Sequence, residues 1–323
     1  MKHIIAATAA LFSLSVSFAA PAQNYPTRPV RFLVPFAPGG SADVLARLMG
    51  KRISDGIGQP LTIENQGGGG GIIAMETVAR SAPDGYTVGL GSVSTLSIAP
   101  GLNPNLRYDA VKSFAHIGLM GTATQALFVS GAVPAKDLRQ LIELAKAKPG
   151  TLNYGSNGIG AVPHLAGELF KTLAGIDLVH VPYKGAAQVT TALLAGDVQL
   201  GFIVPAGQEQ NLQTGRVRVL CVAGPKRLPS LPEVPTSAEA GLPGLETYTW
   251  FGLNAATGTP AAVVARLNAE INRAVADKEL QDTLIKQGVE VAGSTPVEYQ
   301  RLVISDTEKW SKIIKSAGIK LDQ

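Results

Sequence analysis

Two glycine-rich turns hold the residues of this chain that are best suited to binding a ligand. The first turn lies between an apolar run at 30–34 and a helix predicted to begin near Ser41. Backbone N–H groups in the first turn of a helix have no partner within the helix, and the helix dipole adds partial positive charge there. Because the turn contains no Lys or Arg, we expect backbone dipoles to hold an anion here. The candidate residues are Phe36, Ala37, Pro38, Gly39, Gly40, Ser41 and Asp43.

The second turn repeats this pattern further along the chain. A short strand at 153–154 leads into a glycine-rich turn, and a helix is predicted from Pro163. Two such turns facing each other across a cleft would close on a small carboxylate, with charge-assisted hydrogen bonds of about 1.5–3 kcal/mol each. We therefore expect Gly40→Val and Gly158→Val each to abolish carboxylate binding while leaving the fold intact. The candidate residues here are Ser156, Asn157, Gly158, Ile159, Gly160 and His164.

Several side chains near these turns have more than one interpretation. Asp43 orients the first turn or contacts a ligand through water, or else it only caps its own helix. Ser92 and Ser94 follow a buried strand at its carboxyl end, where α/β sheets place ligands, or they form an ordinary hydroxyl-rich turn. Lys184 pairs with the substrate or lies on the surface, and the surface is favoured. A histidine at a helix start, such as His164, is more often a cap or a ligand contact than a catalytic base.

Other residues singled out by type have a structural interpretation. The lone cysteine, Cys221, is expected in the core and excludes an internal disulfide. Trp250 and Phe251 are expected to pack rather than to stack on a ligand. The glycine run at 67–71 is either a flexible turn or a backbone wall beside the ligand.

Short apolar runs alternate with helical patterns along the chain, which predicts an α/β fold with parallel, doubly wound sheets. A first series of such elements covers 30–90, and a second begins with an apolar strand at 117–129 and runs to 204. The predicted strands are 30–34, 61–64, 87–90, 117–129, 153–154, 179–181, 198–204 and 218–222, and the predicted helices between them are 41–53, 72–81, 136–147, 163–173 and 186–195.

The carboxyl-terminal part is predicted to be helical. Thr259 is expected to cap a helix with Pro260 at its first position. A capping box between Thr295 and Glu298 opens the last long helix, which is expected to end at Gly318.

The amino-terminal residues 1–22 are typical of a secretory signal peptide. A basic start is followed by an apolar run at 4–18 and by small residues, which predicts cleavage after Ala22. The remaining chain, of about 300 residues, is long enough for two domains. Hydrophobic residues make up 46% and charged residues 16%, as in a well-packed globular protein. The net charge is +4, but the basic residues are scattered, so we expect no nucleic-acid partner.

Enzyme and metal classes match the sequence poorly. The segment 155–160 spells G-x-x-G-x-G, but Tyr154 stands where the dehydrogenase pattern needs glycine. Ser156 resembles a nucleophile elbow, yet Gly155 lies directly beside it and breaks the G-x-S-x-G spacing. A periplasmic serine hydrolase using Ser156 is the alternative from another class. The histidines lack metal-ligand spacing, so we expect no metal and no cofactor.

Motifs spread along the chain resemble one family of periplasmic receptors, the Bug family of tripartite tricarboxylate transporters. The motifs occur in the family's order from Tyr25 to the carboxyl end. They include Pro35-Phe36-Ala37-Pro38-Gly39-Gly40-Ser41-Ala42-Asp43, Ala82-Pro83-Asp84-Gly85-Tyr86-Thr87, His180-Val181-Pro182-Tyr183-Lys184-Gly185, Leu231-Pro232-Glu233-Val234-Pro235-Thr236 and Trp250-Phe251-Gly252-Leu253. The family's usual Pro-Gly-Ala-Gly-Gly segment is replaced here by Gln66 and the glycine run.

The resemblance implies a two-lobed periplasmic binding protein fold of type II-like architecture, with mixed sheets flanked by helices and a ligand cleft between the lobes. Residues 23–123 with 248–323 would form lobe 1, and 124–247 would form lobe 2. It also implies a monomeric solute receptor that is not an enzyme, with a small carboxylate held by the turns 37–41 and 156–160. Its partner would be a membrane permease or, as an alternative, a membrane sensor kinase.

Overall fold

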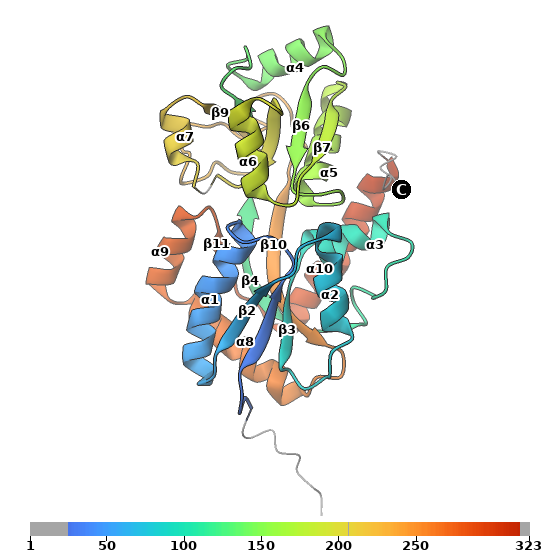
Figure 1. Ribbon diagram of the computed structural model, residues 1–323, viewed down its shortest axis with the longest axis vertical. Helices are drawn as coiled ribbons and strands as arrows, with labels where there is room; N and C mark the ends of the chain where they lie inside the picture. Colours follow the sequence, from blue (N-terminus) through green and yellow to red (C-terminus); the bar gives the residue numbers. More distant parts are fainter. Residues whose placement is uncertain (1–24, 206, 317–323) are drawn as a thin grey trace, which may run out of the picture.

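The computed structural model describes residues 25–205 and 207–316 and shows two sheets stacked end to end, each flanked by helices (Figure 1). The predicted signal peptide and Gly318 lie outside the described residues. Among those described, no helix is both long and apolar enough to cross a membrane.

The lower lobe in Figure 1 contains the six-stranded sheet. Strands β1, β2 and β3 run parallel, as the alternation of strand and helix predicts, whereas β10 is antiparallel to both β3 and β4. In sheet order the strands are β11 (Glu290–Val291), β4 (Phe114–Thr124), β10 (Tyr248–Ala256), β3 (Thr87–Ser92), β1 (Val30–Val34) and β2 (Leu61–Asn65).

Helices that begin directly after parallel strands cover this sheet. Helix α1 (Ser41–Ile57) extends one turn further than predicted and ends at Gly58, which adopts the left-handed conformation that glycine accepts without strain. The other helices of this lobe are α2 (Ile72–Ala79), the π-helix η3 (Val93–Ile98), α3 (Ala99–Leu102), α8 (Ala261–Val275), α9 (Lys278–Lys286) and α10 (Pro296–Ser316), with a short 3₁₀ turn η2 (Gly69–Gly71) before α2.

The upper lobe contains the five-stranded sheet, which is also mixed. Strands β6, β7 and β8 are parallel, and β5 is antiparallel to β8 and β9. In sheet order the strands are β7 (Val179–Pro182), β6 (Asn153–Ser156), β8 (Leu200–Ile203), β5 (Ala126–Ser130) and β9 (Val217–Val222), and the helices are α4 (Leu138–Ala147), α5 (Val162–Ala174), α6 (Ala186–Ala195) and α7 (Glu209–Gln213).

The chain changes sheets within a segment that we predicted as one strand. Residues up to Thr124 belong to β4 in the first sheet, and residues from Ala126 belong to β5 in the second. Between them, the Gln125 N–H donates to the Thr247 carbonyl at 3.5 Å, which joins the outgoing and returning crossings. An apolar run shows that a segment is buried but not in which sheet, so the prediction of one strand at 117–129 is wrong.

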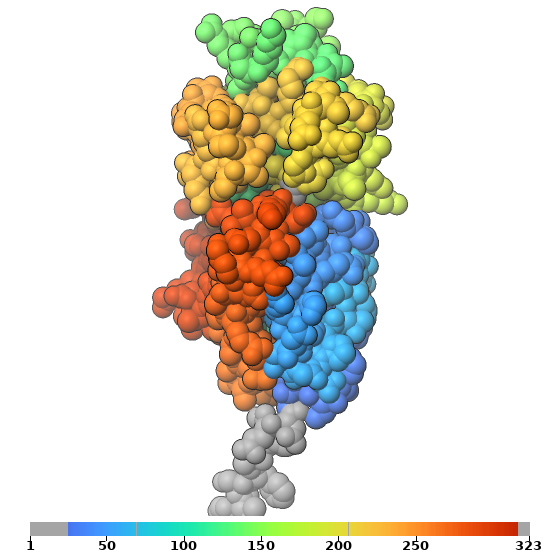
Figure 2. All heavy atoms as spheres, turned by 90° about the vertical axis from the view of Figure 1, so that its left-hand side faces the viewer, coloured from blue at the N-terminus to red at the C-terminus, as the bar shows by residue number. Residues whose placement is uncertain are grey.

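The carboxyl-terminal helices return to the first lobe. Figure 2 shows the amino-terminal part of that lobe in blue and the carboxyl-terminal part in orange packed side by side, in agreement with the contacts between α1 and α8. The predicted capping box is confirmed, because the Thr295 N–H donates to Glu298 Oε2 at 2.8 Å and the Glu298 N–H to Thr295 Oγ1 at 3.2 Å. The predicted Thr259 cap is wrong. Pro260 occupies the N-cap position, and Thr259 Oγ1 instead donates to the Ala256 carbonyl.

Core packing follows the apolar pattern. Cys221 is fully buried in the core of the second lobe, and burial raises the pKa of its thiol to about 12, so it is the core residue that we expected. Trp250 is fully buried, and its Nε1–H donates to Asp306 at 2.6 Å. One apolar cluster crosses between the lobes, because Val162 and Leu165 of α5 pack with first-lobe residues.

Candidate functional site

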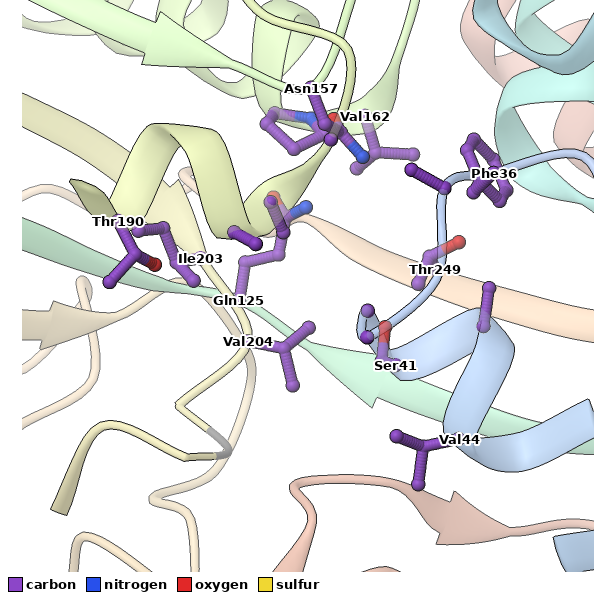
Figure 3. Close-up of a pocket in the computed structure, with 18 of the residues that line it drawn as sticks. Phe36, Ser41, Val44, Gln125, Asn157, Val162, Thr190, Ile203, Val204 and Thr249 are labelled. Carbon is purple, nitrogen blue, oxygen red and sulfur yellow. The ribbon is translucent and has the colours of Figure 1, made fainter. Parts of the chain in front are cut away.

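The cleft between the lobes contains two adjoining compartments. The first has a volume of about 330 Å³ and the second about 880 Å³. Four residues, Phe36, Ala37, Ser94 and Asn157, line both compartments and therefore form the partition between them. Figure 3 shows the first compartment, with Phe36, Ser41 and Thr249 on one side and Gln125, Thr190 and Ile203 on the other.

The start of α1 opens into the first compartment. Gly39, Gly40 and Ser41 line it, and no side chain caps the helix at its N-cap residue, Gly40. A Cβ placed on Gly40 would meet no atom of the described residues within 4 Å, so the space around that position is open. The first predicted turn therefore has the open backbone geometry of an anion site.

A polar network behind this turn fixes its shape. The Gly39 N–H donates to Asp43 Oδ2 at 3.1 Å, and Asn65 Nδ2 donates both to Asp43 Oδ1 at 2.9 Å and to the Phe36 carbonyl at 3.0 Å. Arg47 contacts the same carboxylate at 2.9 Å. Burial raises the pKa of Asp43, but hydrogen bonds from Arg47, Gly39 and Asn65 outweigh burial and hold that pKa below its ordinary value. Of the roles considered for Asp43, the structure supports orientation of the turn.

The second glycine turn uses its polar groups internally. Ser156 Oγ donates to the Gly158 carbonyl and accepts from the Gly158 N–H, and the Gly160 N–H donates to His164 Nδ1 at 3.1 Å. At the start of α5, the Val162 N–H donates across the cleft to Ser94 Oγ at 3.2 Å, and the next residue, Pro163, has no N–H. The N–H groups of Gly158, Gly160 and Val162 are thus already bonded within the protein, and the second anion cradle expected at 156–160 stays a prediction.

Asn157 is the exception in this turn. Its Oδ1 atom is buried and has no hydrogen-bond partner within the described residues, although it lies at the partition. A buried polar atom without a partner is costly, so Asn157 stays a candidate contact for a bound molecule.

Two histidines hold the second turn from behind. His180 Nε2 lies 2.7 Å from Ser156 Oγ in a hydrogen bond, and its ring stacks on Tyr154 at 4.8 Å and on His164 at 4.1 Å. Burial, together with the positive charges that His164 and Lys171 can carry, lowers the pKa of His180 to about 3. Because Ser156 has no exposed surface, the Ser156–His180 pair supports the turn rather than presenting a nucleophile to the cleft.

The site contains a helix end that the sequence analysis missed. Helix α6 begins after Gly185, no side chain caps it, and Gly185, Ala186 and Ala187 line the first compartment. The available signal was the strand at 179–181 followed by glycine and a helix, which repeats the pattern of the two turns that we selected. The first compartment is thus bounded by an uncapped helix end from each lobe.

The remaining predicted residues are divided between the compartments. Ser94 lines both, whereas Ser92 lines neither, because it caps η3 through Thr95. The second compartment is lined by Pro38, Gly158, Ile159, Gly160 and Lys184. Gly67, Gly68, Gly70 and Gly71 also line it, so most of the glycine run forms a backbone wall there. Polar residues of the first compartment that the sequence did not indicate are Gln125, Thr190, Gln208, Thr249 and Gln287.

The structure corrects one of the two glycine substitutions proposed above. Gly158 has φ = 130°, a conformation that valine adopts only with strain, so Gly158→Val cannot leave the local fold intact. Gly40 has φ = −87° and open space around its Cβ position, so Gly40→Val remains a clean test. No group of three or more His, Cys, Asp or Glu side chains suited to a metal ion occurs among the residues that the structure describes.

Comparison with known proteins identifies the family. Residues 45–319 match the family model described as the tripartite tricarboxylate transporter family receptor. The chain belongs to this receptor family. It is 37% identical over 323 residues to the UPF0065 protein of the tcbD-tcbE intergenic region in Pseudomonas sp., covering all of this chain and 96% of that protein. It is 32% identical over 314 residues to BugT of Bordetella pertussis, with 96% of each covered.

Solved structures of related receptors share the fold. The periplasmic binding protein BugD is 34% identical with a TM-score of 0.87, and 92% of this chain and 99% of BugD are covered. An R. palustris protein solved with adipate is 35% identical with a TM-score of 0.88 over 92% of this chain and 99% of that one. MatC from Rhodopseudomonas palustris, with bound malate, is 33% identical with a TM-score of 0.84 over 90% of this chain and all of MatC. The predicted two-lobed periplasmic binding protein fold and the Bug resemblance are confirmed.

Proposed function

We propose that this receptor captures a small carboxylate between its lobes in the periplasm and delivers it to the membrane permease of a tripartite tricarboxylate-type transporter. The observation that carries the proposal is the pair of uncapped helix ends, α1 from one lobe and α6 from the other, which line one compartment. None of the described residues lining that compartment is charged. Backbone dipoles are therefore the main source of positive potential there, and they suit a carboxylate.

The relatives support the class of ligand. Adipate and malate, with which two of the similar structures were solved, are both small carboxylates. We place the carboxylate at Gly39, Gly40 and Ser41, with Ala186 and Ala187 approaching from the other lobe and Asn157 at the partition.

Closure of the lobes provides the mechanism. We take residues 23–123 and 248–323 as one lobe and 124–247 as the other, with the crossings near Gln125 and Thr247 as the hinge. An anion touches both helix ends only when the lobes are together, so binding shifts the population toward the closed arrangement. Gln125 also lines the first compartment, so the ligand contacts the hinge itself.

We propose a binding role without catalysis. The homologues described above are binding proteins, and Ser156, the one candidate nucleophile, is buried and hydrogen-bonded. We propose a monomer that needs no cofactor. A membrane sensor kinase as the partner is the second possibility for a receptor of this kind, but no feature of the cleft favours it.

Calorimetry on the chain from Gln23 to Gln323 tests the proposal. A panel of mono-, di- and tricarboxylates is titrated beside the matched neutral amides, and thermal unfolding is recorded in parallel. Binding of at least one acid, but not of its amide, is the expected result, and ligand at about 100 times its Kd should stabilise by roughly 2.7 kcal/mol. Equal binding of acid and amide, or no binding of any acid, would refute carboxylate capture.

A further inference from the structure

The open turn that we assign to an anion is itself supported by a negative group. Asp43, in the first turn of α1, accepts a hydrogen bond from the Gly39 N–H at 3.1 Å. Only 4% of Asp43 is exposed, so dissolved ions screen its charge weakly. A carboxylate at this place opposes the positive potential that the helix end provides. An anion site at this turn therefore needs a cation that cancels the charge of Asp43 without occupying the cleft.

The carboxylate at position 43 cannot simply be replaced by a neutral amide. Its Oδ2 atom accepts from the Gly39 N–H, and its Oδ1 atom accepts from Asn65 Nδ2 at 2.9 Å. An amide side chain has only one oxygen that accepts hydrogen bonds, whereas a carboxylate has two. The shape of the turn thus depends on both oxygens of Asp43, and the negative charge comes with them.

Arg47 is placed to cancel this charge from outside the cleft. It lies one turn further along α1, where its Nε donates to Asp43 Oδ2 at 3.0 Å and a terminal guanidinium nitrogen lies 2.9 Å from Asp43 Oδ1. This is the bidentate geometry that a guanidinium provides and an ammonium does not. The terminal nitrogen also donates to Asn65 Oδ1 at 3.0 Å. Arg47 is not among the residues that line either compartment, so it is not a ligand contact.

We propose that Arg47 is a positioning residue of the anion site, which acts through Asp43 by keeping the net charge behind the turn at zero. Asp43 can then hold the turn in shape without repelling a bound anion. This inference rests on the proposed function, because it concerns the site that we assign to the carboxylate. An ion pair that only joined two residues of one helix would leave the potential at the turn unchanged when it was removed.

A cysteine at the first position of α1 measures this potential without any ligand. Ser41 lines the first compartment (Figure 3), and burial raises the pKa of the native Cys221 thiol to about 12, so that thiol does not interfere. The pKa of the new thiol in Ser41→Cys is obtained from the rate of its alkylation by iodoacetamide as a function of pH. A helix start favours the thiolate, so this pKa should lie below about 8.5, the value of free cysteine.

Substitutions in this background separate charge from shape. Arg47→Gln leaves the charge of Asp43 uncancelled and should raise the thiol pKa by about one, which is about tenfold less thiolate at neutral pH. Adding Asp43→Asn removes the charge and should restore the pKa. Arg47→Lys keeps the cation and should change the pKa less than half as much as Arg47→Gln. The matched control is Arg52→Gln on the same helix, which removes a cation 2.8 Å from Asp277 and should leave the thiol pKa unchanged. Thermal unfolding verifies that each variant is folded.

The outcomes distinguish this inference from the proposed function. If Arg47→Gln leaves the thiol pKa unchanged, or if Arg52→Gln raises it equally, Arg47 does not set the potential at the turn and the inference is refuted. If the pKa stays raised after Asp43→Asn is added, Arg47 acts on the shape of the turn and the inference is refuted as well. In the calorimetric panel, Arg47→Gln should weaken each acid that binds about tenfold. A panel in which no acid binds would refute carboxylate capture, while the thiol titrations would still decide the role of Arg47.

Discussion

The two glycine turns at the cleft have similar sequences but opposite hydrogen-bonding roles. Around Gly40, side chains from the same lobe hold the turn from behind, and the helix end stays open toward the first compartment. Around Gly158, the turn bonds to Ser156 and His164, and the following helix end is closed by Ser94 from the opposite lobe. The first turn therefore leaves its helix end open toward the first compartment, whereas the second turn uses the Gly158 and Gly160 N–H groups to hold its own shape and the Val162 N–H joins the lobes.

The contrast shows that a strand–glycine–helix pattern predicts a place for an anion but not whether its donors are free. The second open helix end belongs to α6, whose start after Gly185 has neither a capping side chain nor a proline. We therefore propose that α1 pairs across the cleft with α6, although Val162 and Pro163 at the start of α5 also line the first compartment.

The largest effect is expected from blocking the open turn. Gly40→Val places a branched side chain into the space before α1, so the carboxylate identified in the panel should bind at least 100-fold more weakly, about 2.7 kcal/mol. The thermal midpoint should stay within a degree or two of wild type, because no atom of residues 25–205 or 207–316 lies within 4 Å of the new Cβ. Calorimetry and thermal unfolding measure both quantities. Near-normal affinity would mean that the anion does not lie at this turn.

Removing the support behind the open turn should have the next largest effect. Asp43→Ala leaves the Gly39 N–H and the Asn65 amide without their acceptor, which should lower the free energy of unfolding by about 1–3 kcal/mol. Affinity should fall about tenfold, because the turn loses its fixed shape. The control is Asp55→Ala on the same helix, where an exposed pair with Lys51 is removed at little cost. Equal losses in both variants would contradict a positioning role for Asp43.

Acid should lower the stability of the protein through His180, which lies behind the turn at 156–160. The pKa of His180 is lowered to about 3 in the folded protein, so the unfolded chain binds more protons between pH 6.5 and about 3. The free energy of unfolding should therefore fall as the pH drops through this window. His180→Phe retains an aromatic ring but does not titrate. Between pH 7 and pH 5, urea unfolding should show a larger loss of unfolding free energy in the wild type than in this variant. This pH range lies above the ordinary pKa values of Asp and Glu. Equal losses of unfolding free energy in the two proteins would exclude His180 as the source of the pH dependence.

The smallest effect on binding is expected at Ser156. Ser156→Ala removes bonds to His180 and to the Gly158 backbone, so the free energy of unfolding should fall by about 1 kcal/mol, while carboxylate affinity changes less than threefold. Ser305→Ala, on an exposed face of α10, serves as the control for loss of a hydroxyl. Hydrolysis of model esters by the wild type that disappears in Ser156→Ala would overturn the binding role in favour of a serine hydrolase.

Much of the fold could be predicted because apolar runs and turn residues mark it locally. The bounds of β1 at 30–34 and of α6 at 186–195 are as predicted, since prolines, glycines or polar residues flank these runs. The passage from β4 to β5 was not predictable in this way, because pairing partners rather than apolarity assign each half to its sheet.

The site could be predicted only as far as local patterns reach. The residues around Gly40 lie at a compartment as expected, since their geometry depends on neighbours in the same turn. The bond between Ser94 and Val162, by contrast, joins residues 68 positions apart. No sequence pattern shows that this hydroxyl occupies the start of α5. The binding roles of the individual residues remain predictions that the variants above test.

Among the described residues that line the first compartment no side chain is charged, and this has a consequence for the dependence of binding on ionic strength. Dissolved salt screens exposed charges over about 8 Å at physiological concentration, but it acts much less on groups shielded from solvent. A short carboxylate held by backbone N–H groups at two helix ends should therefore keep nearly the same Kd in dilute and in concentrated salt. A receptor built in this way can keep its sensitivity while the osmolarity of its surroundings changes.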